Sequence, residues 1–155
     1  DDKIELNVVD GLILPNLKMQ EKTQACGFLN AQGRCSIHPL RPGICRIFPL
    51  GRYYEDRSFR YFLQVHECKK EPKTKVKVQK WIDTPQAGRN EQFIIDWHYF
   101  VRDLSEQLTN ADDNYQKTVS LYLLKNFYQK PYEDSRDFYE QFYERLTEAK
   151  KIFPV

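Results

Sequence analysis

The sequence predicts an α+β fold in which short strands and an irregular cysteine-loop metal site pack against about three helices. Three observations support this prediction. Apolar and polar residues alternate near the N-terminus, glycine and proline interrupt residues 26–51 at short intervals, and apolar residues recur with helical spacing after residue 84. The chain has 155 residues, of which 41% are hydrophobic, so it can bury a core. We therefore expect 1–155 to form a single domain, with strands and metal site in 1–80 and helices in 84–153.

The N-terminal residues predict a β-hairpin. Residues 3–9 alternate between polar and apolar side chains, and a second extended run covers residues 12–19. Residues 10–11 between the two runs are an Asp-Gly pair, which is typical of a tight turn. Residues 59–65 are rich in aromatic and β-prone side chains, so they predict a strand that leads directly to Cys68.

The C-terminal half predicts three helices. Thr84-Pro85 is expected to start the first, the acidic pair Asp112-Asp113 to lie at the start of the second, and Pro131 to open the third. The residues expected to face the core are Phe93, Ile94, Trp97, Val101, Leu104 and Leu108 in the first helix, Tyr115, Val119, Tyr122, Leu123 and Phe127 in the second, and Tyr132, Phe138, Phe142, Leu146 and Ile152 in the third.

The net charge of +2 conceals a difference between the two halves of the chain. Residues 1–80 carry 15 basic and 9 acidic side chains, whereas residues 81–155 carry 9 basic and 13 acidic ones. All four cysteines lie in the basic half, at Cys26, Cys35, Cys45 and Cys68. We therefore expect the chemistry of the protein in its first half.

The first three cysteines lie in recognisable short motifs. These are Cys-x-Phe-Leu from Cys26, Gly-x-Cys-x-Ile around Cys35 and Arg-Pro-x-x-Cys-Arg-x-Phe-Pro around Cys45. With these motifs, residues 12–68 resemble the cysteine-cluster proteins known as zinc- or iron-chelating domains, which include the flagellin lysine N-methylases. The resemblance implies that Cys26, Cys35 and Cys45 are metal or cluster ligands, with Cys68 as the fourth.

The sequence departs from this family at one point. Family members carry a close group of cysteines that ends in a Cys-Cys pair, and no such group precedes Cys26. Two interpretations stay open, because the chain starts at Asp1: it is a piece of a longer protein, or it is a divergent member. The number of metal ions or clusters stays open with them.

Two other interpretations of the cysteines compete with metal binding. Two disulfides would suit a secreted protein, but we find no basic-then-apolar leader. Buried thiols that pack as small hydrophobic groups rarely concentrate in loops rich in glycine and proline. Metal binding is therefore the interpretation that we favour.

The ligand count does not separate zinc from iron, because structural zinc and a 4Fe-4S cluster both bind four cysteine sulfurs. The four cysteines are single residues on separate segments, and this arrangement suits a four-cornered cluster better than a zinc knuckle. We expect a 4Fe-4S cluster, with zinc as the alternative. Arg46 directly follows Cys45, and we expect its positive charge to stabilise the anionic cluster.

The residues identify no reaction. The six glycines form no nucleotide-binding motif, and the chain has no Cys-x-x-x-Cys-x-x-Cys for radical chemistry, so whether it is an enzyme stays open. We expect a cytoplasmic iron-sulfur protein with a redox role, or a part of a protein-modifying enzyme assembly. The alternative is a structural zinc module that binds a protein partner.

Two segments bear on partners. Phe138, Tyr139, Phe142 and Tyr143 lie on both sides of the third helix and predict a surface for a protein partner. The lysine-rich residues 69–80, followed by Trp81, are expected to form a solvated connector, so we expect no nucleic-acid binding there. No apolar run approaches the ~20 residues of a membrane span.

Overall fold

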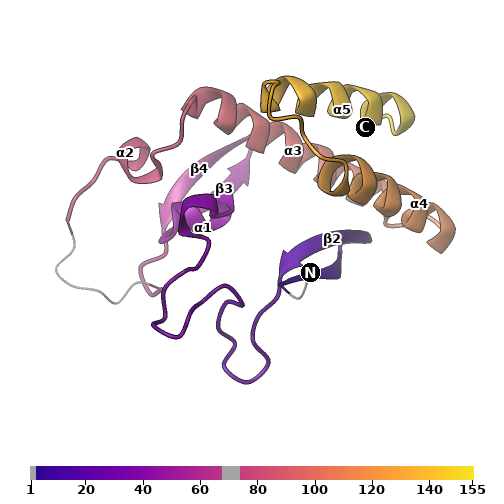
Figure 1. Cartoon of the computed structure of the whole chain (residues 1–155). Helices are drawn as coiled ribbons and strands as arrows, with labels where there is room; N and C mark the ends of the chain where they lie inside the picture. The colour runs from indigo at the N-terminus through magenta and orange to yellow at the C-terminus, as the bar shows by residue number, and fades with distance from the viewer. Residues whose placement is uncertain (1–2, 68–73) are drawn as a thin grey trace. The chain divides into compact units, whose positions relative to one another are not determined.

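The computed structural model describes residues 3–67 and 74–155 (Figure 1). It contains two antiparallel two-stranded sheets and five α-helices, which confirms the predicted α+β class. The chain divides into two compact units, one made of residues 1–35 and 100–155 and the other of residues 36–99. The single domain over 1–155 stays a prediction.

The first unit begins with the predicted hairpin. Strand β1 (Ile4–Val9) pairs with β2 (Leu12–Leu17) in an antiparallel register that places Val9 opposite Leu12. Asp10 and Gly11 both have positive φ, at 48° and 80°, which is the conformation of a two-residue hairpin turn. β2 packs against the helices of this unit, and Leu12 is fully buried.

The helical part of the first unit contains the end of α3 (Ala87–Leu108), then α4 (Asp113–Leu123), its π-helical continuation η2 (Leu124–Gln129), and α5 (Phe138–Ile152). The Asp112 carboxylate caps α4 by accepting from the amides of Asn114 and Tyr115. The buried apolar side chains of this unit are Leu12, Phe100, Leu104, Leu108, Val119, Leu123, Leu124, Phe127, Phe142, Leu146, Ala149 and Phe153.

The second unit contains the 3-10 turn η1 (His38–Leu40), the short helices α1 (Gly43–Ile47) and α2 (Val78–Ile82), the hairpin of β3 (Leu50–Glu55) and β4 (Ser58–Leu63), and the first part of α3. Tyr54 of β3 stacks on His98 of α3 with ring centroids 3.5 Å apart. The Tyr99 hydroxyl donates to the Ser58 carbonyl at 3.0 Å. Burial is the main cause that raises the pKa of Tyr54, against the opposing charge of Arg52.

Two predicted helix starts were wrong. α3 begins at Ala87 rather than at Pro85, because Asp83 and Gln86 have positive φ, at 45° and 53°, which a right-handed helix cannot accommodate. α5 begins at Phe138 rather than at Pro131, because the Asp137 carboxylate accepts from the Glu140 amide and caps the helix there.

Three side chains predicted to face the core are exposed instead. They are Tyr115, Phe138 and Ile152. Each lies near an end of its helix, where fewer neighbours are available to cover an apolar stripe. The predicted strand over 59–65 is confirmed as β4, although it ends at Leu63. Its partner β3 and the five-residue helices α1 and α2 were not predicted.

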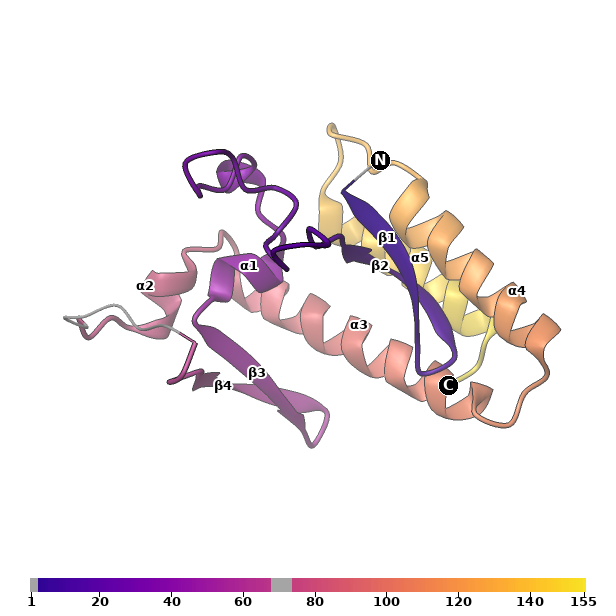
Figure 2. The same ribbon diagram turned by 90° about the horizontal axis from the view of Figure 1, so that it is seen from below.

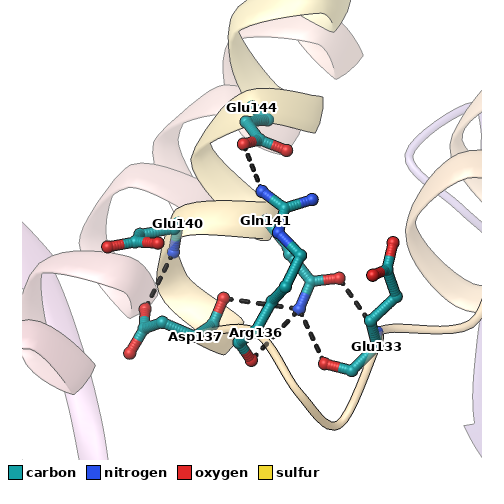
Figure 3. Close-up of polar contacts among 6 residues, drawn as sticks. All are labelled: Glu133, Arg136, Asp137, Glu140, Gln141 and Glu144. Carbon is teal, nitrogen blue, oxygen red and sulfur yellow. Dashed lines mark hydrogen bonds and ion pairs between the residues drawn. The ribbon is translucent and has the colours of Figure 1, made fainter.

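One buried polar side chain fixes the loop before α5. Gln141 is 4% exposed, and its Oε1 accepts from the Glu133 amide at 2.9 Å (Figure 3). Its Nε2 donates to the carbonyls of Glu133 at 3.0 Å and Arg136 at 3.3 Å. Arg136 in the same loop pairs with Glu144 of α5. Gln141 therefore satisfies backbone groups that have no regular structure around them.

Gln141→Leu should lower the free energy of unfolding by about 2–3 kcal/mol, because the substitution removes the side-chain partners of the Glu133 amide and of the Arg136 carbonyl. Gln129→Leu is the matched control, since Gln129 is exposed at the end of η2. It should change stability by less than ~0.5 kcal/mol. Urea denaturation of both variants measures the difference, and equal stability of the two would contradict this role of Gln141.

Candidate metal centre

Cys26 lies just beyond β2, in a segment held by backbone hydrogen bonds. It forms an isolated β-bridge with Met19, and the next amide, that of Gly27, donates to the Lys18 carbonyl at 3.1 Å. A Cβ atom at Gly27 would lie 2.8 Å from that carbonyl oxygen. Glycine is therefore required for the chain to approach β2 this closely. The Cys26 side chain is half-buried.

Cys35 follows a turn that Asn30 organises. The Asn30 Oδ1 accepts from the amides of Gln32 at 3.0 Å and Arg34 at 2.9 Å, and Gly33 has a φ of 70°. Leu29 connects the two cysteines, because its amide donates to the Cys26 carbonyl at 3.1 Å and it forms a β-bridge with Cys35. Cys35 is also half-buried. The role of Asn30 was not predicted, although an asparagine three residues before a glycine is a turn signal.

Cys45 lies in the middle of α1. Its amide donates to the Pro42 carbonyl at 2.9 Å, and the Arg46 amide donates to the same carbonyl at 3.2 Å. The Cys45 side chain is half-buried, the Arg46 side chain is exposed, and Ile47 anchors the helix in the core of the second unit. The short helix thus holds Cys45 between a buried residue and solvent.

Trp81 of α2 binds the end of α1. Its Nε1 donates to the carbonyls of Ile47 at 3.3 Å and Phe48 at 3.1 Å. These carbonyls are near the helix end, where no intrahelical donor is available. The sequence places Trp81 beside an expected solvated connector, and this contact was not predicted. A second hydrogen bond holds the residues that follow α1. The Gln64 amide, just after β4, donates to the Pro49 carbonyl, just before β3, at 3.0 Å.

Cys68 and part of the lysine-rich segment, Lys69 to Lys73, lie outside the described residues. In the rest of that segment, Lys75, Lys77 and Lys80 are exposed.

The predicted ligands do not form a ready-made metal site within the described residues. Over 3–67 and 74–155, no three His, Cys, Asp or Glu side chains lie close enough together to hold a metal ion. Cys26 and Cys35 belong to the first unit, and Cys45 belongs to the second. The donor chemistry nevertheless fits, because half-buried sulfur atoms on ordered turns are ligands that zinc and iron-sulfur clusters both accept.

The comparisons with known proteins address the family. Residues 11–83 match the CxxCxxCC family, described as a "putative zinc- or iron-chelating domain". The match confirms the resemblance predicted from the cysteine motifs, and it supports metal binding by either metal. No curated protein and no solved structure matches the chain. None of the helices in the described part of the chain is both long and apolar enough to cross a membrane.

Gly27→Ala should destabilise the first unit by about 1–3 kcal/mol, because the added methyl group meets the Lys18 carbonyl. Gly88→Ala is the matched control. Gly88 lies in the first turn of α3, and apart from its own helix backbone and chain neighbours no atom lies within 4 Å of the position that a methyl group would take there. Alanine should therefore leave stability unchanged or raise it slightly. Urea denaturation and hydrogen exchange at the residue-27 amide test this, and two variants of equal stability would show that the close approach is dispensable.

Proposed function

We propose, from the match of residues 11–83 to the cysteine-cluster family, that the chain binds a 4Fe-4S cluster through the thiolates of Cys26, Cys35, Cys45 and Cys68. One observation carries the proposal. The described cysteines lie half-buried on separate segments, each held by its own hydrogen bonds, and a zinc knuckle would instead present them as a close pair.

Three hydrogen bonds made by described residues on either side of Cys68 support it as a partner of Cys45. The Gln64 amide binds the Pro49 carbonyl, and the Trp81 indole binds the carbonyls at the end of α1. The described residues on both sides of Cys68 are thus attached just after Cys45 in the chain. We therefore propose Cys68 as the ligand that joins Cys45 in the set.

The side chains of the site would have defined roles. Each cysteine must lose its proton to bind metal, so metal affinity should rise with pH until the thiols are ionised. The positive charge of Arg46, one residue from Cys45, would favour the thiolates and the anionic cluster. A bound cluster would supply one-electron redox chemistry. We propose that this chemistry serves a redox role or a protein-modifying assembly, in the cytoplasm, where thiols stay reduced.

The second candidate is a structural zinc module that binds a protein partner through α5. One observation favours it: Phe138 is 40% exposed, although it contacts the rings of Tyr132 and Tyr139. Tyr139 and Tyr143 are only half-buried. An aromatic surface of this kind is typical of protein interfaces.

The protein purified without oxygen should contain about four iron and about four sulfide per chain and show a broad visible absorption that bleaches on reduction. Cys45→Ala should lose most of the iron and sulfide, because one thiolate of the set is removed. Ser36→Ala is the control, since Ser36 adjoins Cys35 but carries no thiol. Metal and sulfide analysis compares the iron and sulfide content of the unsubstituted protein, Cys45→Ala and Ser36→Ala.

Cys68→Ala extends the same test to the fourth ligand and should also lose the cluster. Full retention of iron and sulfide in this variant would remove Cys68 from the ligand set. Stoichiometric zinc without sulfide in the unsubstituted protein would contradict the 4Fe-4S cluster and favour the structural zinc module.

Arg46→Ala should shift the reduction potential of the cluster to a more negative value. Reduction adds negative charge, and removal of a nearby positive charge makes the reduced state less stable. Arg60→Ala is the control, because Arg60 is exposed on β4 and pairs with Glu55 at 3.1 Å. Redox titration measures both potentials. If the two variants shift the potential equally, Arg46 has no specific role.

A further inference from the structure

β1 and β2 form an antiparallel hairpin (Figure 2), and its two outer edges differ in their hydrogen bonding. In an antiparallel pair, alternate residues direct their backbone groups toward the partner strand and away from it. The Lys18 amide donates to the Lys3 carbonyl at 2.9 Å, so Lys3 and every second residue after it face β2. Ile4, Leu6 and Val8 therefore direct their amides and carbonyls to the outer edge of β1.

The outer edge of β2 is closed. The Ile13 amide donates to the Oγ of Ser120 on α4 at 3.0 Å, and Pro15, the next outward-facing residue, has no amide hydrogen. Hydrogen bonds to a neighbouring element and proline are both devices that prevent further strand pairing. β1 contains no proline, and in the described part of the chain it pairs with β2 alone. The outer edge of β1 is therefore the one at which another strand can pair.

The outward-facing residues of β1 are also apolar and exposed. Leu6 is 58% exposed and Val8 is 74% exposed. The register places Ile4, Leu6 and Val8 opposite three further apolar residues of β2, Leu17, Pro15 and Ile13, so one face of the hairpin is apolar throughout. An exposed apolar strand with unpaired backbone groups readily adds another strand.

We propose that the outer edge of β1 pairs with β1 of a second copy of this chain, antiparallel and centred on Leu6. In this register Leu6 lies opposite Leu6 of the second copy, and Ile4 lies opposite Val8. These are the three residues whose backbone groups face outward, so every pair can exchange hydrogen bonds. The product is a four-stranded sheet with two-fold symmetry.

The sequence of β1 is complementary to itself in this register, which favours a second copy over an unrelated peptide. The apolar side chains meet on one face, and on the other face Glu5 lies opposite Asn7 of the second copy. The Asn7 amide already donates to the Glu5 carboxylate within one strand, at 3.2 Å, so the pair is chemically compatible. No like charges oppose one another between Ile4 and Val9.

Sedimentation equilibrium of the full chain should show a dimer whose population rises with protein concentration. Leu6→Lys should abolish the dimer, because it places two lysines opposite each other at the symmetry axis. Leu40→Lys is the matched control, since Leu40 is 81% exposed and lies in the other unit. It should leave the dimer intact. A protein that stays monomeric at all concentrations, or a dimer that survives Leu6→Lys, would overturn the proposal.

Two substitutions at Asn7 test the register without altering the apolar face. Asn7→Lys places a lysine opposite Glu5 of the second copy and should strengthen the dimer by roughly 2- to 30-fold, and Asn7→Glu should weaken it by a similar factor. Circular dichroism of each variant serves as the control for folding. In addition, the Leu6 amide should exchange more slowly at high protein concentration, whereas the Ile13 amide should not change. Equal affinities for the two Asn7 variants would rule out this register.

Discussion

The packing of β2 against α4 and η2 fixes the N-terminal hairpin and the segment that carries Cys26. Leu12 is fully buried, and the Ile13 amide is bound by Ser120 of α4, so β2 belongs to the helical core as much as to its own sheet. β1 depends on β2 through the Asp-Gly turn, and the Cys26 segment depends on it through the Lys18 carbonyl. A hairpin of two strands is marginal alone, so its order comes from this burial.

The cysteine segments illustrate how a chain can be ordered without long helices or strands. Between Lys18 and Arg46, single turns, two isolated β-bridges and one side-chain amide satisfy much of the backbone. These contacts span only a few residues each, and the longest connection that they make between cysteines is the one through Leu29 from Cys26 to Cys35. A bound metal would add what local turns lack, namely a link between segments that are distant in sequence, and its binding energy would contribute to folding.

The features predicted correctly from the sequence are those that local chemistry decides. The Asp10-Gly11 turn and the apolar stripes around Leu104, Val119 and Phe142 have signals within a few residues. The features that were missed depend on distant partners. α1 is a single helical turn whose end is bound by Trp81, from 34 residues further along, and β3 is defined by its pairing with β4.

For the candidate site too, the sequence predicted the features with local signals and missed those that depend on the backbone path. The cysteine motifs predicted the resemblance that the match over residues 11–83 confirms, because short motifs are written in the residues themselves. The set of cysteine ligands stays a prediction. The roles of Gly27 and Asn30 required the backbone path, since a close approach to Lys18 or a turn around Arg34 is not visible in the spacing of cysteines.

The position of the tryptophans has a consequence for spectroscopy. The chain has two tryptophans, Trp81 and Trp97, and both lie in the unit of residues 36–99. Light that excites tryptophan but not tyrosine therefore produces fluorescence from this unit alone. The unit of residues 1–35 and 100–155 has no tryptophan and does not contribute. The Trp81 indole donates to the carbonyls at the end of α1, so its part of the emission should report on the helix that carries Cys45.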